Sequence, residues 1–403
     1  SSIVHLRFMS KFPIKKNCHF NEKMFKPDFK KAFDKEKSIL QFFGVYPISD
    51  PKVNFERIRC FISYSLNVIN VSLMMMLLLV NDIENFIDAS DFIVITFTFL
   101  WKFTLFVLGK GMDLIEDHIN LIDVSSIPAG IMEHVRKEEE GRNWIYFPQR
   151  YVVQGAALFL VISCFLHQSD RRLILISWVP FDLQDLIYYY LTIFFQTIAF
   201  LASGVPNGCI DIMYYILVDI ASCQMDILIY NLVNLDSSKG NVELYQELNK
   251  IIINHIEIIR FAKNLQNVYS NIIFVQCIGS VMVFCILGFE LSVTIPFPSE
   301  KFFLRALYIF SMIFQIFCYT WFGQKLMVKS EEVAKACYLS KWNQFCPEIQ
   351  KSLLIVMTRC KKPIILNAGI FNLTLETFTM ILRTSYSYMA LLGTVYGQYI
   401  TKK

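Results

Sequence analysis

The chain has 403 residues, of which 55% are hydrophobic and 18% charged, and its mean hydropathy is +0.44. This balance is typical of a polytopic membrane domain and excludes an ordinary soluble enzyme. The formal net charge is +4. In a membrane protein this excess of basic residues reports how the chain is oriented in the membrane, and it gives no reason to expect a nucleic-acid partner.

Seven apolar runs follow one another along the chain, each about long enough to cross a hydrocarbon layer of about 30 Å as a helix. The runs are 60–81, 92–109 (broken by Lys102), 151–168, 186–210, 264–289, 306–324 and 384–401. They predict an all-α membrane protein with seven transmembrane helices.

The basic residues between these runs are distributed very unevenly. Of the 38 Lys and Arg residues, 30 fall before Cys60 or in 110–150, 235–263 and 325–362, whereas six fall in the opposite set of segments. Because positive charge is retained on the cytoplasmic side, we expect a cytoplasmic N-terminus and an extracellular C-terminus. This orientation is the reverse of that of a G-protein-coupled receptor.

Three segments on the cytoplasmic side have helical character. The charged segment 110–150 predicts extensions of the second and third helices, and the apolar spacing in 242–266 predicts an extension of the fifth. Residues 325–377 alternate charge with apolar runs that are too short to span a membrane and too apolar to be solvated. We expect helices in 330–362 that pack against the same region of neighbouring subunits, with a hairpin within one chain as the alternative.

The seventh run carries small hydroxyl groups and single large apolar groups on one helical stripe. Its members are Thr384, Ser387, Tyr388, Leu391, Thr394 and Val395. Hydroxyl groups can solvate a hydrated cation and a ring of apolar side chains can close a pore by dewetting, so the stripe predicts a pore lining. A helix–helix packing seam is the alternative, because Ser and Thr also favour close contact in membranes.

Lys102 and Arg383 are the charges placed most deeply in the apolar runs. A cation at the bilayer centre costs roughly 2.5–3.5 kcal/mol on insertion scales, so each should face protein, water or an interface. We expect Arg383 to point away from any cation path.

Several motifs in the second half of the chain resemble those of insect odorant receptors. The strongest are Ala368-Gly369, Leu375–Thr379 and Leu382–Tyr388 near the C-terminus, with Trp178–Asp182 in the second outer loop. Further matching positions are His255, Ser270, Gln276, Ser280, Cys285, Phe289, Ser330, Glu331, Ala336, Tyr338 and Trp342. The resemblance covers most of the chain from about residue 170 onward.

Within this family the chain resembles a tuning subunit. The co-receptor has a long insertion in its second cytoplasmic loop, whereas here only about 30 residues separate Asp236 and Asn264. The related gustatory receptors have a different C-terminal motif from Thr384-Ser385-Tyr386.

The resemblance implies an odorant-gated, nonselective cation channel assembled as a heterotetramer with the co-receptor. Its place would be the plasma membrane, in the dendrites of olfactory sensory neurons. The chain then divides into a cytoplasmic N-terminal region (1–59), helices one to six with the ligand pocket (60–324), a cytoplasmic anchor for subunit assembly (325–377), and the pore-lining seventh helix with a short extracellular tail (378–403). Leu391 matches the family's gate position, with Thr394 and Val395 at the outer mouth.

The family also implies a pocket for a small volatile apolar molecule in the outer half of the bundle, between helices two, three, four and six. Mapping residues by depth gives Ile95, Thr98, Phe99, Phe159, Ile162, Ser163, Tyr188, Thr192, Gln196, Phe303, Leu307 and Phe310. For any single member, ordinary core packing is the alternative.

Other functional classes have less support. A seven-helix receptor acting through a G protein and a gustatory-type channel subunit remain the alternatives, while a transporter lacks the expected inverted repeat. No nucleophile–base constellation or Cys-x-x-Cys spacing occurs, so we expect no enzyme activity, cofactor or metal. Besides the co-receptor and the ligand, only membrane lipid is expected as a partner.

Overall fold

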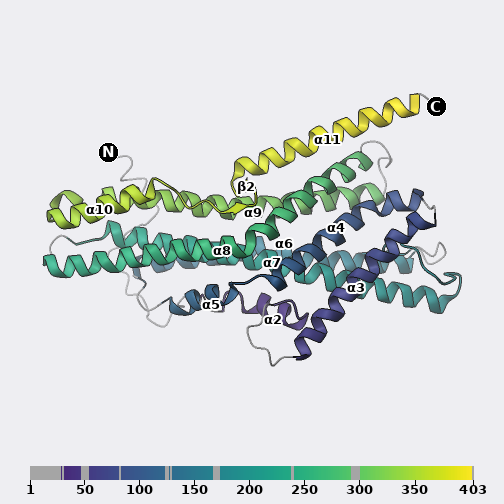
Figure 1. The fold of residues 1–403 in the computed structure, drawn as a ribbon, viewed down its shortest axis with the longest axis horizontal. Coiled ribbons are helices and arrows are strands. Elements are labelled where there is room, and N and C mark those ends of the chain that lie inside the picture. The colour runs from purple at the N-terminus through teal and green to yellow at the C-terminus, as the bar shows by residue number, and fades with distance from the viewer. Residues whose placement is uncertain are drawn as a thin grey trace.

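The computed structural model describes residues 29, 31–46, 54–80, 83–122, 127, 129–166, 173–236, 240–291 and 300–401. These residues form a bundle of long helices with one two-stranded hairpin (Figure 1). In chain order the elements are α2 (Asp34–Phe42), α3 (Asn54–Leu79), α4 (Ile83–Leu108), α5 (Met112–Leu121), α6 (Ala129–Leu166), α7 (Leu186–Val233), α8 (Asn241–Phe289), α9 (Glu300–Leu339), η4 (Trp342–Gln344), α10 (Pro347–Cys360), β1 (Asn367–Ala368), β2 (Phe371–Asn372) and α11 (Leu375–Thr401).

The seven predicted membrane helices correspond to α3, α4, α6, α7, α8, α9 and α11. Five of them, all except α6 and α11, are long and apolar enough to cross a membrane by length and composition among the described residues. Helix α11 carries Glu376, Arg383 and several hydroxyl side chains.

The centre of the bundle is α7, whose residues 206–229 are all buried. A helix that is apolar all round must be covered on every side, and α7 packs against α2, α3, α4, α6, α8 and α9. Aromatic rings fill the contact: Tyr214 lies 5.3 Å from both Tyr269 and Tyr319, and Tyr215 lies 5.3 Å from Phe322, between ring centroids.

The expected extensions beyond the membrane are only partly correct. Helices α6 and α8 are continuous through their charged or amphipathic halves, as predicted. The second helix is different, because α4 ends at Leu108 and a separate α5 follows. Gly111 adopts a φ of 114°, a left-handed backbone that other residues avoid, and it redirects the chain there.

The region after α9 folds back along the bundle (Figure 1). Helix α10 packs on α9, and the β1–β2 hairpin lies against α8. Two backbone amides fix this segment, since Ile364 N donates to Ser330 Oγ at 2.9 Å and Gly369 N donates to Ser270 Oγ at 3.1 Å. Helix α11 then runs along the upper edge of the bundle and contacts α8 and α9.

Candidate functional site

The outer half of the bundle holds two small apolar clusters joined by Phe92 of α4. One cluster, centred on Met74, Leu175 and Tyr189, contains side chains of α3, α7 and the segment that precedes α7. The other is centred on Ile95 of α4 with Val283 and Leu287 of α8. Phe92 packs against both clusters, so it lies where α4, α7 and α9 approach one another.

Helix α9 turns a different face inward from the one that the depth mapping predicted. Phe303, Leu307 and Phe310 are 60%, 65% and 66% exposed, on the outside of this chain's own bundle. The inward face instead carries Met312 and Tyr308, which packs against the Ile95 cluster. A ligand role for the three outward residues stays a prediction.

The predicted residues of α4 and α6 are divided between interior and surface. Ile95 and Phe99 lie in the contact with α8 and α9, and Thr98 is buried against Gly279 of α8. Phe159 and Ile162 of α6 are 45% and 47% exposed. The side chain of Ser163 lies outside the described part of the structure.

The predicted residues of α7 have different surroundings. Tyr188 is half exposed and its ring stacks on Phe181, 5.1 Å away between centroids. Thr192 Oγ1 donates to the Tyr188 carbonyl at 2.8 Å. Gln196 is only 1% exposed, and its side-chain amide is satisfied by hydrogen bonds. It accepts from the backbone N–H of Leu175 and donates to the Leu175 carbonyl and to the hydroxyl of Ser177. Gln196 thus holds the outer loop onto the bundle.

Polar groups stand at the outer rim of this region. Arg305 of α9 forms ion pairs with Asp91 of α4 and with Glu290, the latter at 3.3 Å, and its guanidinium lies 5.4 Å from the centre of the Phe92 ring. One turn further along α9, the hydroxyl of Tyr308 is buried and makes no hydrogen bond to any described residue. A buried hydroxyl without a partner can donate to an acceptor atom of a ligand.

Below the clusters lies a central polar network, defined as Lys102, Asp211, Gln276, Gln315 and Tyr319. Lys102 and Asp211 are both fully buried and form an ion pair at 2.6 Å, and Gln276 accepts a second bond from Lys102 at 2.9 Å. Gln315 and Tyr319 of α9 donate to the same carboxylate. Of the three surroundings expected for Lys102, protein, water or an interface, the structure shows protein, and the network ties α4, α7, α8 and α9 together.

Helix α11 uses one face for its own chain and exposes the other. Ile381 and Ser385 are buried, and Cys285 of α8 donates to the Ser385 carbonyl at 3.6 Å. On the other side, all predicted pore residues with described side chains are exposed: Thr384, Ser387, Tyr388, Leu391 and Thr394. The stripe therefore does not form a helix–helix contact within this chain. The side chain of Val395 lies outside the described part of the structure.

The family model described as "7tm Odorant receptor" matches residues 82–386. The match covers most of the chain and includes five of the seven membrane helices, α4, α6, α7, α8 and α9, together with the first part of α11. The chain belongs to the odorant receptor family.

Known proteins of this kind are similar to the receptor in sequence and in fold. Odorant receptor 9a of Drosophila melanogaster is 24% identical over 53% of this chain and 54% of that protein. Odorant receptor 10 of Aedes albopictus is 32% identical over 37% of this chain and 39% of that protein. The receptor thus matches about half or less of the length of these curated relatives.

A solved structure extends the likeness to the whole fold. The insect olfactory receptor OR5 from Machilis hrabei, in complex with eugenol, superposes with a TM-score of 0.78 at 16% identity. The superposition covers 92% of this receptor and all of that chain. The receptor therefore has the fold of that seven-helix membrane protein.

Sequence reasoning missed the inward face of α9, although a signal for it was present. Arg305, Tyr308, Met312, Gln315 and Tyr319 recur at spacings of three and four, and they include Arg305 and Gln315, two of the polar residues in this largely apolar stretch. Polar side chains inside a membrane helix favour the protein interior, so their register marks the buried face.

Proposed function

We propose that the receptor is the odorant-binding subunit of a heteromeric, ligand-gated, nonselective cation channel. Its partners would be a co-receptor subunit and a small volatile ligand, and it would act in the plasma membrane. The observation that carries this proposal is the hydroxyl-bearing face of α11, which the receptor's own helices leave uncovered. Family membership supports the odorant-binding part.

The ligand would bind in the outer half of the bundle, around Phe92, Tyr189, Ile193, Tyr308 and Met312. These side chains supply apolar and aromatic surface from α4, α7 and α9. Burying about 300 Å² of a volatile molecule at about 25 cal/mol per Å² contributes roughly 7 kcal/mol, which corresponds to an affinity near the micromolar range before ordering losses.

The hydroxyl of Tyr308 adds a polar contact to this apolar site. Since it has no hydrogen-bond partner among the described residues, an odorant with a carbonyl, ester or ether oxygen would satisfy it. The site therefore favours oxygen-containing volatiles over hydrocarbons of the same size.

Opening would follow because the ligand binds the open state more tightly than the closed one. Two helices connect the binding region to α11. Helix α8 contacts both α4 and α11, and helix α9 contacts both α7 and α11. Leu391 would close the pore as an apolar ring, with Thr384, Ser387 and Thr394 lining the hydrated path.

The segment 325–377 exposes several large apolar side chains. Tyr338, Leu354, Ile355 and Ile370 are 69%, 61%, 70% and 82% exposed. Exposed large apolar side chains favour contact with another protein. They support the proposed anchor in 325–377.

The proposal is tested by recording currents from cells that express the receptor with and without a co-receptor, against a panel of volatiles. We expect odorant-evoked cation current that needs the co-receptor and persists when G-protein signalling is blocked. Tyr308→Phe should reduce sensitivity to oxygenated odorants about tenfold, the effect of roughly 1.4 kcal/mol, and spare hydrocarbons. A surface-expressed pair without any odorant current, or a response that G-protein blockade abolishes, would contradict the channel function.

A further inference from the structure

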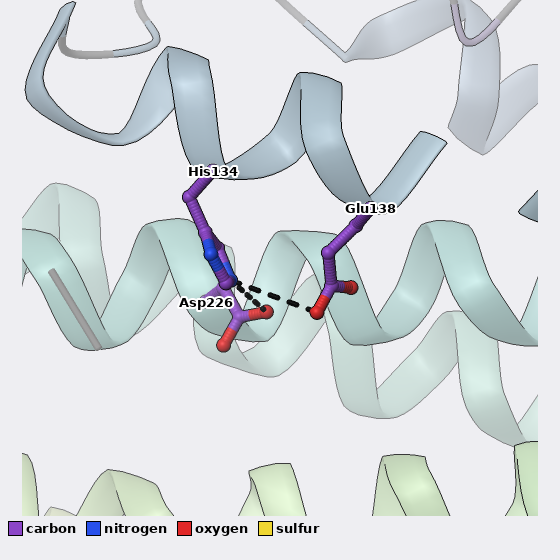
Figure 2. A group of neighbouring side chains, drawn as sticks. All are labelled: His134, Glu138 and Asp226. Carbon is purple, nitrogen blue, oxygen red and sulfur yellow. Dashed lines mark ion pairs between the residues drawn. The ribbon is translucent and has the colours of Figure 1, made fainter. Parts of the chain in front are cut away.

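Three metal-ligating side chains meet at the inner ends of α6 and α7 (Figure 2). His134 and Glu138 lie one turn apart on α6, and Asp226 points toward them from α7. His134 Nε2 lies 3.6 Å from Glu138 Oε1 and 3.8 Å from Asp226 Oδ2. All three ligand atoms lie within 4.8 Å of one another.

These separations suit a four-coordinate zinc ion. Zinc binds imidazole nitrogen and carboxylate oxygen at about 2.0–2.2 Å, which places tetrahedral ligand atoms about 3.4 Å apart. The two distances from His134 Nε2 exceed that value by a few tenths of an ångström, and the two carboxylates lie within 4.8 Å of each other, so side-chain rotations would have to complete the site.

The carboxylate oxygens that face His134 are left available by their neighbours. Asp226 is 1% exposed, and its Oδ1 is paired with Lys329 while its Oδ2 accepts no hydrogen bond from any described residue. Glu138 likewise presents Oε2 to Lys325 at 2.5 Å and Oε1 to His134. The two lysines therefore orient the carboxylates in the way that outer-shell partners orient metal ligands.

We propose that His134, Glu138 and Asp226 bind a zinc ion, with water as the fourth ligand. One nitrogen and two carboxylate oxygens match the ligand preferences of zinc, whereas calcium and magnesium prefer larger sets of oxygen ligands. The ion joins α6 to α7 at the inner end of the bundle. The sequence predicted no metal because Asp226 lies far along the chain from His134.

The test is zinc binding to the purified full-length receptor after removal of metal with a chelator. Titration against a competing fluorescent chelator should show one equivalent of tightly bound zinc. His134→Gln and Asp226→Asn should each weaken binding at least about 10-fold. The matched control is Glu133→Gln, because Glu133 neighbours His134 in sequence but is more exposed and pairs with Arg136 instead.

Two results would overturn the proposal: no stoichiometric zinc binding by the unmodified receptor, or equal affinity in His134→Gln. Cobalt provides a measurement that does not depend on folding of the variants. Cobalt bound to the unmodified receptor should give the intense visible absorption of a tetrahedral site, which zinc then displaces. A weak octahedral spectrum would contradict the site.

Discussion

The ion pair of Lys102 with Asp211 joins α4 to α7 in the interior of the bundle. Both side chains are fully buried, and Asp211 also accepts hydrogen bonds from Gln315 and Tyr319. A buried pair of this kind adds little net stability over apolar residues, but removal of one member leaves the other charge uncompensated.

We therefore expect Asp211→Asn or Lys102→Met to destabilise the receptor by about 3–5 kcal/mol. The double variant Lys102→Met with Asp211→Asn should recover a large part of that loss, since no unpaired charge remains. Thermal unfolding of the purified proteins measures both effects. Single variants as stable as the unmodified receptor would show that the pair is not buried.

His118 predicts how stability depends on pH outside the membrane-spanning helices. Burial beside Phe261, 4.6 Å away between ring centroids, lowers its pKa below the ordinary value, although a contact with Gln224 at 3.3 Å opposes the shift. As the pH falls below about 6.5, the unfolded chain takes up a proton that the folded receptor resists. Folding stability is therefore lost in that range.

His118→Gln should lessen this acid sensitivity, because glutamine stays neutral. Melting temperatures of the variant and the unmodified receptor at about pH 5.5 and about pH 7.5 provide the comparison. The drop on acidification should be smaller in the variant. A drop of equal size would exclude His118 as a contributor.

Single-residue environments were the hardest feature to predict from the sequence. The deep position of Lys102 indicated that it should face protein, water or an interface, and the structure places it against Asp211. The partner itself could not be predicted, because it depends on which faces of α4 and α7 meet. The same limit affected α9, where depth alone did not distinguish Leu307 from Tyr308.

At the scale of the elements, α4 and α8 pack closely together at Gly279. A methyl group at Gly279 would overlap Thr98 Oγ1 and lie only 2.9 Å from Thr98 Cγ2. Glycine is thus required here by packing between helices.

Gly279→Ala should destabilise the receptor by about 1–3 kcal/mol, the usual effect of overpacking a helix contact. Adding Thr98→Ala should reverse part of this loss by removing the overlapping atoms. Gly155→Ala is the control, since no atom lies within 4 Å of its added methyl group. Unfolding temperatures that fall equally in both alanine variants would argue against the close contact.

The membrane helices themselves could be predicted from the sequence, because a long apolar run that crosses a bilayer satisfies its backbone hydrogen bonds by forming a helix. Each of the seven predicted runs has most of its described residues in a long helix, and the continuation of α8 into its amphipathic half followed from apolar spacing. The break between α4 and α5 was missed, since it depends on the left-handed backbone of Gly111. The β1–β2 hairpin was also missed, because each strand has only two residues.

For the whole molecule, orientation in the membrane is the next feature to test. The unequal distribution of basic residues predicts a cytoplasmic N-terminus and an extracellular C-terminus. An epitope fused after Lys403 should be labelled on intact cells, whereas one fused before Ser1 should need permeabilisation. The opposite labelling pattern would contradict the proposed topology.

The central claim is that α11 lines a cation pore that Leu391 closes. The most direct measurement is ligand-free current in cells that express the co-receptor with either the unmodified receptor or Leu391→Ala. If the lost side chain weakens closure by about 1.4 kcal/mol, open probability without ligand should rise about tenfold. Tyr386→Ala, exposed on α11 outside the predicted stripe, should leave it unchanged. Unaltered ligand-free current in Leu391→Ala at normal surface expression would contradict the account.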